Sequence, residues 1–255
     1  MKKVETFLKF ENEIDFFSLV TNFDEYQEMV ASAKKAGFNN NVDFYYFDNI
    51  TKNEFDGYSA LSHALQVSNA QYLIFCHQDI LFNYDGYSDL IECIKKIEKF
   101  DENWAVLGNA GRNANGKYYI NITDPNGRQI IGDFPSDVMS LDENFLVINN
   151  KLNIRCTSTL KGFHLYGTDL CYNANYLGFK NYVINFHVFH KSPGYLNKSF
   201  FDSRNDFIRL LQDRKKSQII FTACTKFYAS CNSLLNIIFN YKIINKFLRI
   251  IKGME

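Results

Sequence analysis

Short apolar runs alternate with stretches of helical spacing along the first half of the chain, and this alternation restricts the fold more than any other feature. The runs at 14–20, 42–47, 72–75 and 104–108 have the length and composition of buried strands. Amphipathic stretches lie between them, and Gly37 stands where the first helix is expected to end. Strands separated by helices form βαβ units in a sheet buried on both faces. The sequence therefore predicts an α/β fold with a mostly parallel central sheet flanked by helices.

The second half of the chain predicts an extension of this sheet and a separate C-terminal part. Residues 111–155 are rich in Asn, Gly and Asp and contain short alternating runs, which favours loops and a small antiparallel extension. A helix at 168–177 and a strand at 182–184 follow. We assign residues 1–215 to one domain and residues 216–255 to an amphipathic, helical C-terminal extension.

The C-terminal extension has two interpretations. Lys242, Lys246 and Arg249 fall on one side of a helical projection, and apolar residues cover the other side. Such a helix either lies on an anionic lipid surface or packs against the domain or a partner chain. Peripheral membrane contact and a homo-oligomer both stay open on this pattern.

Composition excludes several classes of protein. Twenty-eight basic and 28 acidic residues leave no net charge, whereas a general nucleic-acid binder carries a basic excess. A hydrophobic content of 46% excludes a disordered chain. The six cysteines form no CxxC pair, and no uninterrupted apolar run reaches the roughly 18 residues of a membrane span. The first residues lack a signal-peptide pattern, so we expect a cytoplasmic protein with reduced thiols.

Polar or small residues follow each predicted strand, at 21–22, 48–49, 76–79 and 109–111. In open parallel sheets, ligands bind beyond the carboxyl ends of the strands. We expect a crevice of the nucleotide-binding type at this edge, although the outline alone does not select a chemistry.

Asp79 and His77 are candidate ligands at the end of the third strand. They are two residues apart and therefore lie on the same side of the strand. A carboxylate and an imidazole suit a divalent cation or a diphosphate, while a lone carboxylate at this place can also simply cap a turn. His190 precedes a Pro-Gly turn and is placed to add one ligand from a loop.

Asp169 is a candidate base. A helix that starts at Gly167 or Thr168 places Asp169 in its first turn. A carboxylate there can interact with the helix dipole without a functional role, or it can act as a base at a loop–helix junction. Spacing alone slightly favours the dipole role.

Three segments together resemble the GT-A glycosyltransferases: residues 75–80 (FCHQDI), 164–171 (HLYGTDLC) and 190–194 (HKSPG). More narrowly, they are similar to the family-2-like branch whose metal motif reads HQD in place of DxD. The resemblance spans about Phe17 to Gly194. GxSxG, Walker lysine-loop and HExxH motifs are absent, which disfavours the hydrolase and kinase classes that use them.

The resemblance implies two groups of site residues. The first binds the donor and its metal: Thr21, Asn22, Asp48, His77, Asp79 and His190. Asp79 and His190 would hold Mn²⁺ or Mg²⁺ against the donor diphosphate, and His77 would face ribose or phosphate. In the second group, Asp169 is the general base that deprotonates the acceptor hydroxyl, and Glu143 and His164 face the acceptor.

The activity implied by the resemblance is inverting transfer of a sugar from a nucleotide-sugar donor, by default a UDP-sugar, to a hydroxyl of a glycan or glycolipid. Such a protein would work in polysaccharide biosynthesis at the cytoplasmic face of the cell membrane. Two alternatives stay open. One is a non-catalytic nucleotide- or sugar-binding module. The other is a nucleotidyltransferase, which normally has a basic, glycine-rich loop after its first strand, unlike residues 21–24 here.

Overall fold

The computed structural model describes residues 10–194, 197–214, 217–221, 226–230 and 232–240. The chain divides into two compact units, Met1–Asn205 and Asp206–Glu255. The boundary therefore falls inside a helix, about ten residues before the one expected from the sequence.

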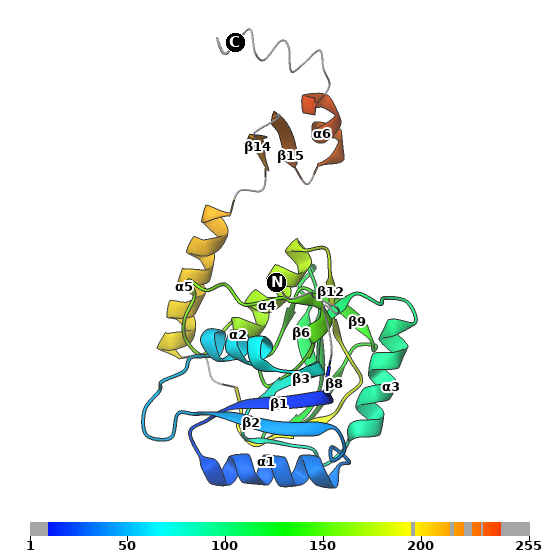
Figure 1. Cartoon of the computed structure of the whole chain (residues 1–255), viewed down its shortest axis with the longest axis vertical. Coiled ribbons are helices and arrows are strands. Elements are labelled where there is room, and N and C mark those ends of the chain that lie inside the picture. Colours follow the sequence, from blue (N-terminus) through cyan, green and yellow to red (C-terminus); the bar gives the residue numbers. More distant parts are fainter. Residues whose placement is uncertain (1–9, 195–196, 215–216, 222–225, 231, 241–255) are drawn as a thin grey trace, which may run out of the picture. The chain divides into compact units, whose positions relative to one another are not determined.

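A seven-stranded central sheet forms the core of the first unit (Figure 1). Its strands, in spatial order, are β2 (Val42–Asp48), β1 (Asn12–Val20), β3 (Ala70–Cys76), β11 (Phe145–Asn149), β5 (Trp104–Gly108), β12 (Lys180–Val183) and β9 (Ser136–Val138). β2, β1, β3, β5 and β12 run in one direction, and β11 and β9 run in the other. The predicted α/β fold with a mostly parallel central sheet is confirmed.

A second sheet is the small antiparallel extension that residues 111–155 led us to expect. Its order is β10 (Ser140–Leu141), β6 (Ala110–Arg112), β7 (Tyr118–Asp124), β13 (Val188–His190) and β4 (Ile80–Leu81), with β8 (Gly127–Ile131) paired to β7. All of its pairs are antiparallel except that between β7 and β13. Because β4 follows β3 directly, this sheet adjoins the carboxyl end of β3.

Helices cover both faces of the central sheet, which explains why its inner strands β3, β11 and β5 are almost entirely apolar. They are α1 (Phe23–Lys35), α2 (Gly57–Val67), α3 (Tyr87–Glu98) and α4 (Tyr166–Tyr176), and a 3₁₀ turn, η1 (Asn150–Leu152), follows β11. α1 and α3 contribute to the main apolar cluster on one face, and α2 packs with α4 on the other. On β1, adjacent Phe16 and Phe17 point to opposite faces and are both buried. Both faces of the inner strands are thus shielded from water, whereas the edge strand β2 is partly exposed.

Local sequence sets where the helices near the site begin. Asn22 Oδ1 accepts hydrogen bonds from the backbone N of Asp24 and Glu25, which caps α1 directly after β1. Asp56 caps α2 in the same way. Gly37 has φ +97°, as expected for a glycine that ends α1. The cap by Asn22 lets α1 begin after a connection of only two residues from β1.

The C-terminal part contains more than the expected helix. α5 (Lys198–Asp213) is followed by a hairpin of β14 (Ser217–Phe221) and β15 (Lys226–Ser230), and then by α6 (Ser233–Asn240). The hairpin is a feature that helical projection did not predict. Lys242, Lys246 and Arg249 lie outside the described residues. Within the described part of the chain, no helix combines the length and apolar character needed to cross a membrane.

Gly86→Ala is expected to destabilise the junction between α1 and α3. A Cβ at position 86 would collide with the carbonyl oxygen of Ala36, which also accepts a hydrogen bond from Tyr87 N at 3.0 Å. Because backbone atoms cannot swing aside, we expect the free energy of unfolding to fall by about 1–3 kcal/mol, the usual range for overpacking. Urea denaturation measures this loss. Gly194→Ala is the matched control, since nothing lies within 4 Å of a Cβ there, and equal losses in the two variants would contradict the interpretation.

Candidate functional site

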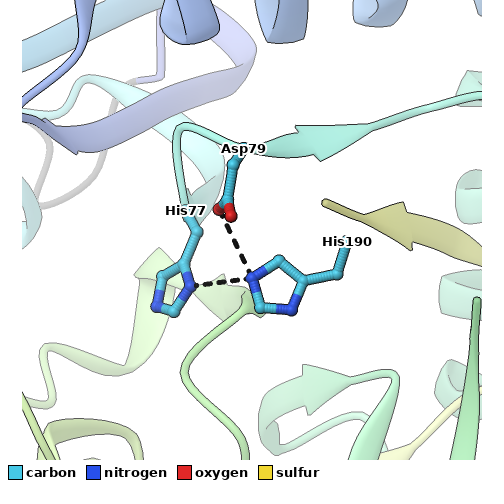
Figure 2. Close-up of side chains that lie close together, drawn as sticks. All are labelled: His77, Asp79 and His190. Carbon is cyan, nitrogen blue, oxygen red and sulfur yellow. Dashed lines mark hydrogen bonds and ion pairs between the residues drawn. The ribbon is translucent and has the colours of Figure 1, made fainter. Parts of the chain in front are cut away.

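His77, Asp79 and His190 come together at the carboxyl end of β3 (Figure 2). His77 and Asp79 belong to the short connection between β3 and β4, and His190 is the last residue of β13. The antiparallel pair of β4 and β13 sets His190 opposite Ile80, the residue after Asp79. Backbone pairing therefore brings together side chains that are more than a hundred positions apart in the sequence.

The three side chains are within hydrogen-bond reach of one another. His190 Nε2 lies 3.3 Å from Asp79 Oδ1 and 3.4 Å from His77 Nδ1. Ser192 Oγ donates a hydrogen bond of 2.6 Å to Asp79 Oδ2 and lies 3.2 Å from His190 Nε2. The side chains of His190 and Asp79 are only 11% and 14% exposed. These two side chains are thus mostly enclosed, and His190 and Ser192 hold the two oxygens of Asp79.

Burial and neighbouring groups set the protonation of this cluster. Burial alone would raise the pKa of Asp79, but hydrogen bonds from His190 and Ser192 and the charge of His190 hold it well below its usual range. Burial lowers the pKa of His77, and the nearby His190 lowers it further. At neutral pH, Asp79 is therefore a carboxylate, and His77 is a neutral imidazole with a free lone pair.

This set of donors fits a divalent cation. One ligand atom from each of His77, Asp79 and His190 lies within 4.8 Å of the others. Metal ligands must be deprotonated, and the protonation states of Asp79 and His77 meet that condition. Imidazole nitrogen suits first-row transition metals, whereas Mg²⁺ prefers oxygen ligands. The donor set favours Mn²⁺ over Mg²⁺ among the two cations expected from the sequence.

Gln78, between the two metal-site residues, is a structural clamp that sequence reasoning missed. Its Oε1 accepts hydrogen bonds from Thr21 N at 2.8 Å and Asn22 N at 3.0 Å, and its Nε2 donates to Thr21 Oγ1 and Glu25 Oε2, both at 3.1 Å. The sequence contained one indication of this role. A side chain between two candidate ligands is expected to point away from the ligand site and toward another part of the protein. Gln78 thus ties the turn between β1 and α1 to the metal site.

A pocket of about 260 Å³ opens beside the cluster, at the ends of β1, β2 and β3. Its lining consists of Leu19, Thr21, Asn49, Phe75, Cys76, His77, Gln78, Asp79, Phe163 and Tyr166. Thr21 is therefore at the pocket. Asn22 caps α1, and Asp48 is exposed, with its Oδ1 accepting a hydrogen bond from Ile50 N at 3.0 Å. Asn49 lines the pocket, and Asp48, the residue expected there from the sequence, does not.

Asp169 is enclosed at the start of α4 and does not line the pocket. Its side chain is fully buried at the start of α4, and Oδ2 and Oδ1 accept hydrogen bonds from Thr157 N at 2.6 Å and Thr157 Oγ1 at 2.8 Å. Asn173 Nδ2 donates to Oδ2 at 3.2 Å. This carboxylate fastens the preceding loop to α4. The expected role as a base facing the crevice is at odds with this geometry, because the first turn of a helix has a buried side as well as an open one.

Glu143 and His164 lie close to the start of the same helix. Glu143 Oε1 accepts a hydrogen bond from Gly167 N at 3.2 Å, and Glu143 is half-buried. Burial and the nearby Asp142 charge raise the pKa of Glu143 to about 8. His164 Nε2 lies 2.9 Å from Ser199 Oγ, and burial lowers the pKa of His164. His164 adjoins Phe163, and Gly167, which donates to Glu143, adjoins Tyr166. Phe163 and Tyr166 line the pocket, whereas Glu143 and His164 are one residue or one contact removed from it.

The chain has a relative of similar length. It is 31% identical over 218 residues to the protein described as ATP synthase subunits region ORF 6 of Fuscovulum blasticum, and the match covers 81% of this chain and 88% of that protein. No protein-family model matches the chain.

Two solved structures have similar folds. One is the mannosyltransferase PcManGT from Pyrobaculum calidifontis in complex with GDP-Man and Mn²⁺, with a TM-score of 0.50, 10% identity, and coverage of 83% of this chain and 69% of that one. The other is residues 1–349 of S. aureus TarS in complex with UDP-GlcNAc, with a TM-score of 0.51, 13% identity, and coverage of 80% and 68%. At such identities the likeness concerns the fold alone, and the fold is GT-A.

Mn²⁺ is expected to raise the melting temperature of the protein, and Asp79→Asn is expected to weaken this effect. Losing the only carboxylate of the cluster should lower Mn²⁺ affinity by more than about tenfold, because even outer partners of metal ligands contribute about 10- to 100-fold. Thermal unfolding over a series of Mn²⁺ concentrations measures the affinity. His63→Ala, which removes an exposed histidine of α2, is the control. An unchanged Mn²⁺ response in Asp79→Asn would rule out this metal site.

Asp169→Asn is expected to lower the free energy of unfolding by about 1–3 kcal/mol, because the amide replaces one of the two oxygens that accept hydrogen bonds from Thr157 N and Oγ1 with a donor. Chemical denaturation measures this change. Asp48→Asn is the control, since an exposed amide oxygen can still accept the hydrogen bond from Ile50 N. If both variants unfold at the same denaturant concentration, Asp169 does not anchor α4.

Proposed function

The chain belongs to the same family as the ORF 6 protein of the ATP synthase subunits region of Fuscovulum blasticum, and we propose that it is a glycosyltransferase with a nucleotide-sugar donor. One observation carries the proposal: His77, Asp79 and His190 converge beside a pocket at the carboxyl ends of the strands of a GT-A fold. Ligands of open α/β sheets bind at this edge. The two similar structures hold GDP-Man with Mn²⁺ and UDP-GlcNAc, which supports a donor of this class.

The pocket offers distinct surroundings for the parts of such a donor. The nucleoside would lie near Thr21 and Asn22, whose turn Gln78 holds in place, and near Asn49, which lines the pocket and follows the exposed Asp48. The diphosphate would lie toward the metal cluster. A divalent cation held there by Asp79 and His190, with His77, supplies charge that stabilises the departing nucleoside diphosphate. Ser192 keeps Asp79 oriented toward that position.

We take the reaction to be a single displacement that inverts the anomeric centre. The acceptor oxygen bonds to the anomeric carbon as the bond from that carbon to the diphosphate oxygen breaks, and the electron pair leaves with the diphosphate. The hydroxyl proton must pass to a base of the protein. Glu143 and His164 lie at the side where we place the acceptor, a hydroxyl of a glycan or glycolipid.

The C-terminal part is proposed to bring the protein to its acceptor at the cytoplasmic face of a membrane. α6 exposes Leu234, Ile237 and Ile238, which are between 37% and 67% accessible. An apolar helix face next to a basic sequence is typical of peripheral membrane contact. A role in polysaccharide biosynthesis would follow from this location.

Donor turnover by the purified full chain tests the proposal. UDP-, GDP-, CDP- and dTDP-sugars are incubated with the protein and Mn²⁺, and release of nucleoside diphosphate is measured. We expect release from one class of donor, and loss of at least about 90% of it in Asp79→Asn, because charge stabilisation of a leaving group typically contributes about 10²-fold or more. His63→Ala should behave as the wild type.

Two outcomes would contradict the proposal. Saturable stabilisation of the fold by a nucleoside diphosphate without any turnover would indicate the non-catalytic binding module. Turnover of a nucleoside triphosphate with release of pyrophosphate would instead indicate a nucleotidyltransferase.

A further inference from the structure

We propose that Glu143, and not Asp169, is the catalytic base that accepts the proton of the acceptor hydroxyl. This inference rests on the proposed glycosyl transfer and assigns its missing proton acceptor. A base must expose a carboxylate oxygen to the cleft within hydrogen-bond reach of the substrate. Asp169 is fully buried, and both of its oxygens accept hydrogen bonds from inside the protein. Glu143 is only half-buried.

Glu143 lies between the metal cluster and the start of α4. The next residue, Asn144, accepts a hydrogen bond from His77 N at 3.0 Å through its backbone oxygen, so the segment of Glu143 is fastened to the end of β3. On the other side, Glu143 Oε1 accepts from Gly167 N at 3.2 Å. Tyr166, which adjoins Gly167, lines the pocket together with His77. Glu143 is thus held at the border between the donor pocket and the helix start.

Gly167 leaves the space that Glu143 occupies. A Cβ at position 167 would lie 3.3 Å from Glu143 Cγ, 3.1 Å from the backbone oxygen of Leu141 and 3.2 Å from Leu146 Cδ1. These are tight contacts, so any side chain there would press on Glu143. The glycine lets a carboxylate from another segment approach the amide groups at the N-terminus of α4.

The surroundings of Glu143 suit proton exchange near neutral pH. Burial raises its pKa most, the charge of Asp142 raises it further, and the backbone amides of Gly167 and Thr168 oppose this rise, with a resulting pKa of about 8. A base works best when its pKa is near the working pH. The titratable groups that face Glu143 are Asp142 on its own segment, Tyr58 on α2, Cys156 in the loop before α4, and Tyr166 and Cys171 on α4.

The proton balance of the step is complete with this residue. The acceptor O–H bond breaks, its electrons form the new bond to the anomeric carbon, and the proton moves to a carboxylate oxygen of Glu143. The electron pair of the broken glycosyl–phosphate bond leaves with the nucleoside diphosphate. Glu143 then returns the proton to water, and no further reactant is needed.

Glu143→Gln tests the assignment. We expect transfer to fall by about 10²- to 10⁴-fold in kcat, the usual contribution of a general base, with donor binding unchanged. Glu143→Asp should recover part of the rate, because it keeps a carboxylate. Asp142→Asn is the matched control: it should keep transfer, and the pH at which the rate is half-maximal should fall, since a negative charge beside the base is removed.

The stability of Glu143→Gln separates a base from a structural residue. A carboxyl group whose pKa is raised on folding stabilises the fold fully below its unfolded pKa, and this stabilisation is lost as the pH rises through the folded pKa of about 8. Glutamine keeps an oxygen for Gly167 N but does not ionise. The melting temperature of Glu143→Gln should therefore match or exceed that of the wild type at pH 9, while transfer is lost.

The outcomes distinguish this inference from the proposed function. If the wild type transfers sugar and Glu143→Gln transfers it equally well, Glu143 is not the base, and the glycosyltransferase assignment stands. The same conclusion holds if Glu143→Gln loses activity only together with a lowered melting temperature at pH 9. If the wild type turns over no donor, the proposed function itself is wrong, and the assignment of a base falls with it.

Discussion

The short antiparallel pair of β4 and β13 is the interaction on which the site depends. It sets His190 opposite Ile80, and Lys191 N adds a hydrogen bond of 3.1 Å to the backbone oxygen of Asp79. Main-chain hydrogen bonds therefore position the segments that carry Asp79 and His190. Lys191 Nζ then reaches Glu28 on α1 at 2.6 Å, so the same turn also connects to the first helix. Without this pairing, the chain would hold His77 and Asp79 beside one another but leave the third donor free in a loop.

The residues that sequence reasoning placed well are those whose position follows from strand ends. His77 and Asp79 follow a clearly apolar strand, as expected. They lie in the turn after β3, so alternation along a strand does not set their side, but their side chains do come together. The resemblance to GT-A enzymes supplied His190, because no local pattern shows that a histidine late in the chain pairs with β4. Continuous apolar runs mark buried parallel strands in the sequence. They therefore predicted both the central sheet and the position of Asp79 just after one of its strands.

Other features depend on contacts that no local pattern carries. Helical spacing put Asp169 in the first turn of α4, but which side of that turn is buried depends on Thr157, twelve residues earlier. The position of Glu143 depends on the absence of a side chain at Gly167. The hairpin of β14 and β15 was hidden by a composition that fits an amphipathic helix equally well, because short apolar runs with interspersed polar residues satisfy both periods.

The carboxyl groups of Asp79 and Glu143 have pKa values shifted in opposite directions, and their neighbours explain the difference. Burial raises the pKa of both Asp79 and Glu143, but Asp79 faces donors from His190 and Ser192, whereas Glu143 faces the charge of Asp142. Asp79 is thus ionised at neutral pH, as a cation ligand must be, whereas Glu143, with a pKa of about 8, exchanges a proton near neutral pH. Environments that separate the pKa values of two acids are a recurrent basis for assigning acid and base roles.

The imidazole of His77 also changes the charge of the proposed metal site. Two carboxylate ligands would neutralise a divalent cation, whereas one carboxylate ligand, Asp79, together with two imidazole ligands would leave it with one net positive charge. The cation would therefore be held less tightly by the protein alone and would attract a diphosphate more strongly. By linkage, each ligand then raises the affinity of the other by the same factor. In the proposed function, the His77, Asp79 and His190 cluster would therefore bind metal and donor together more favourably than either alone.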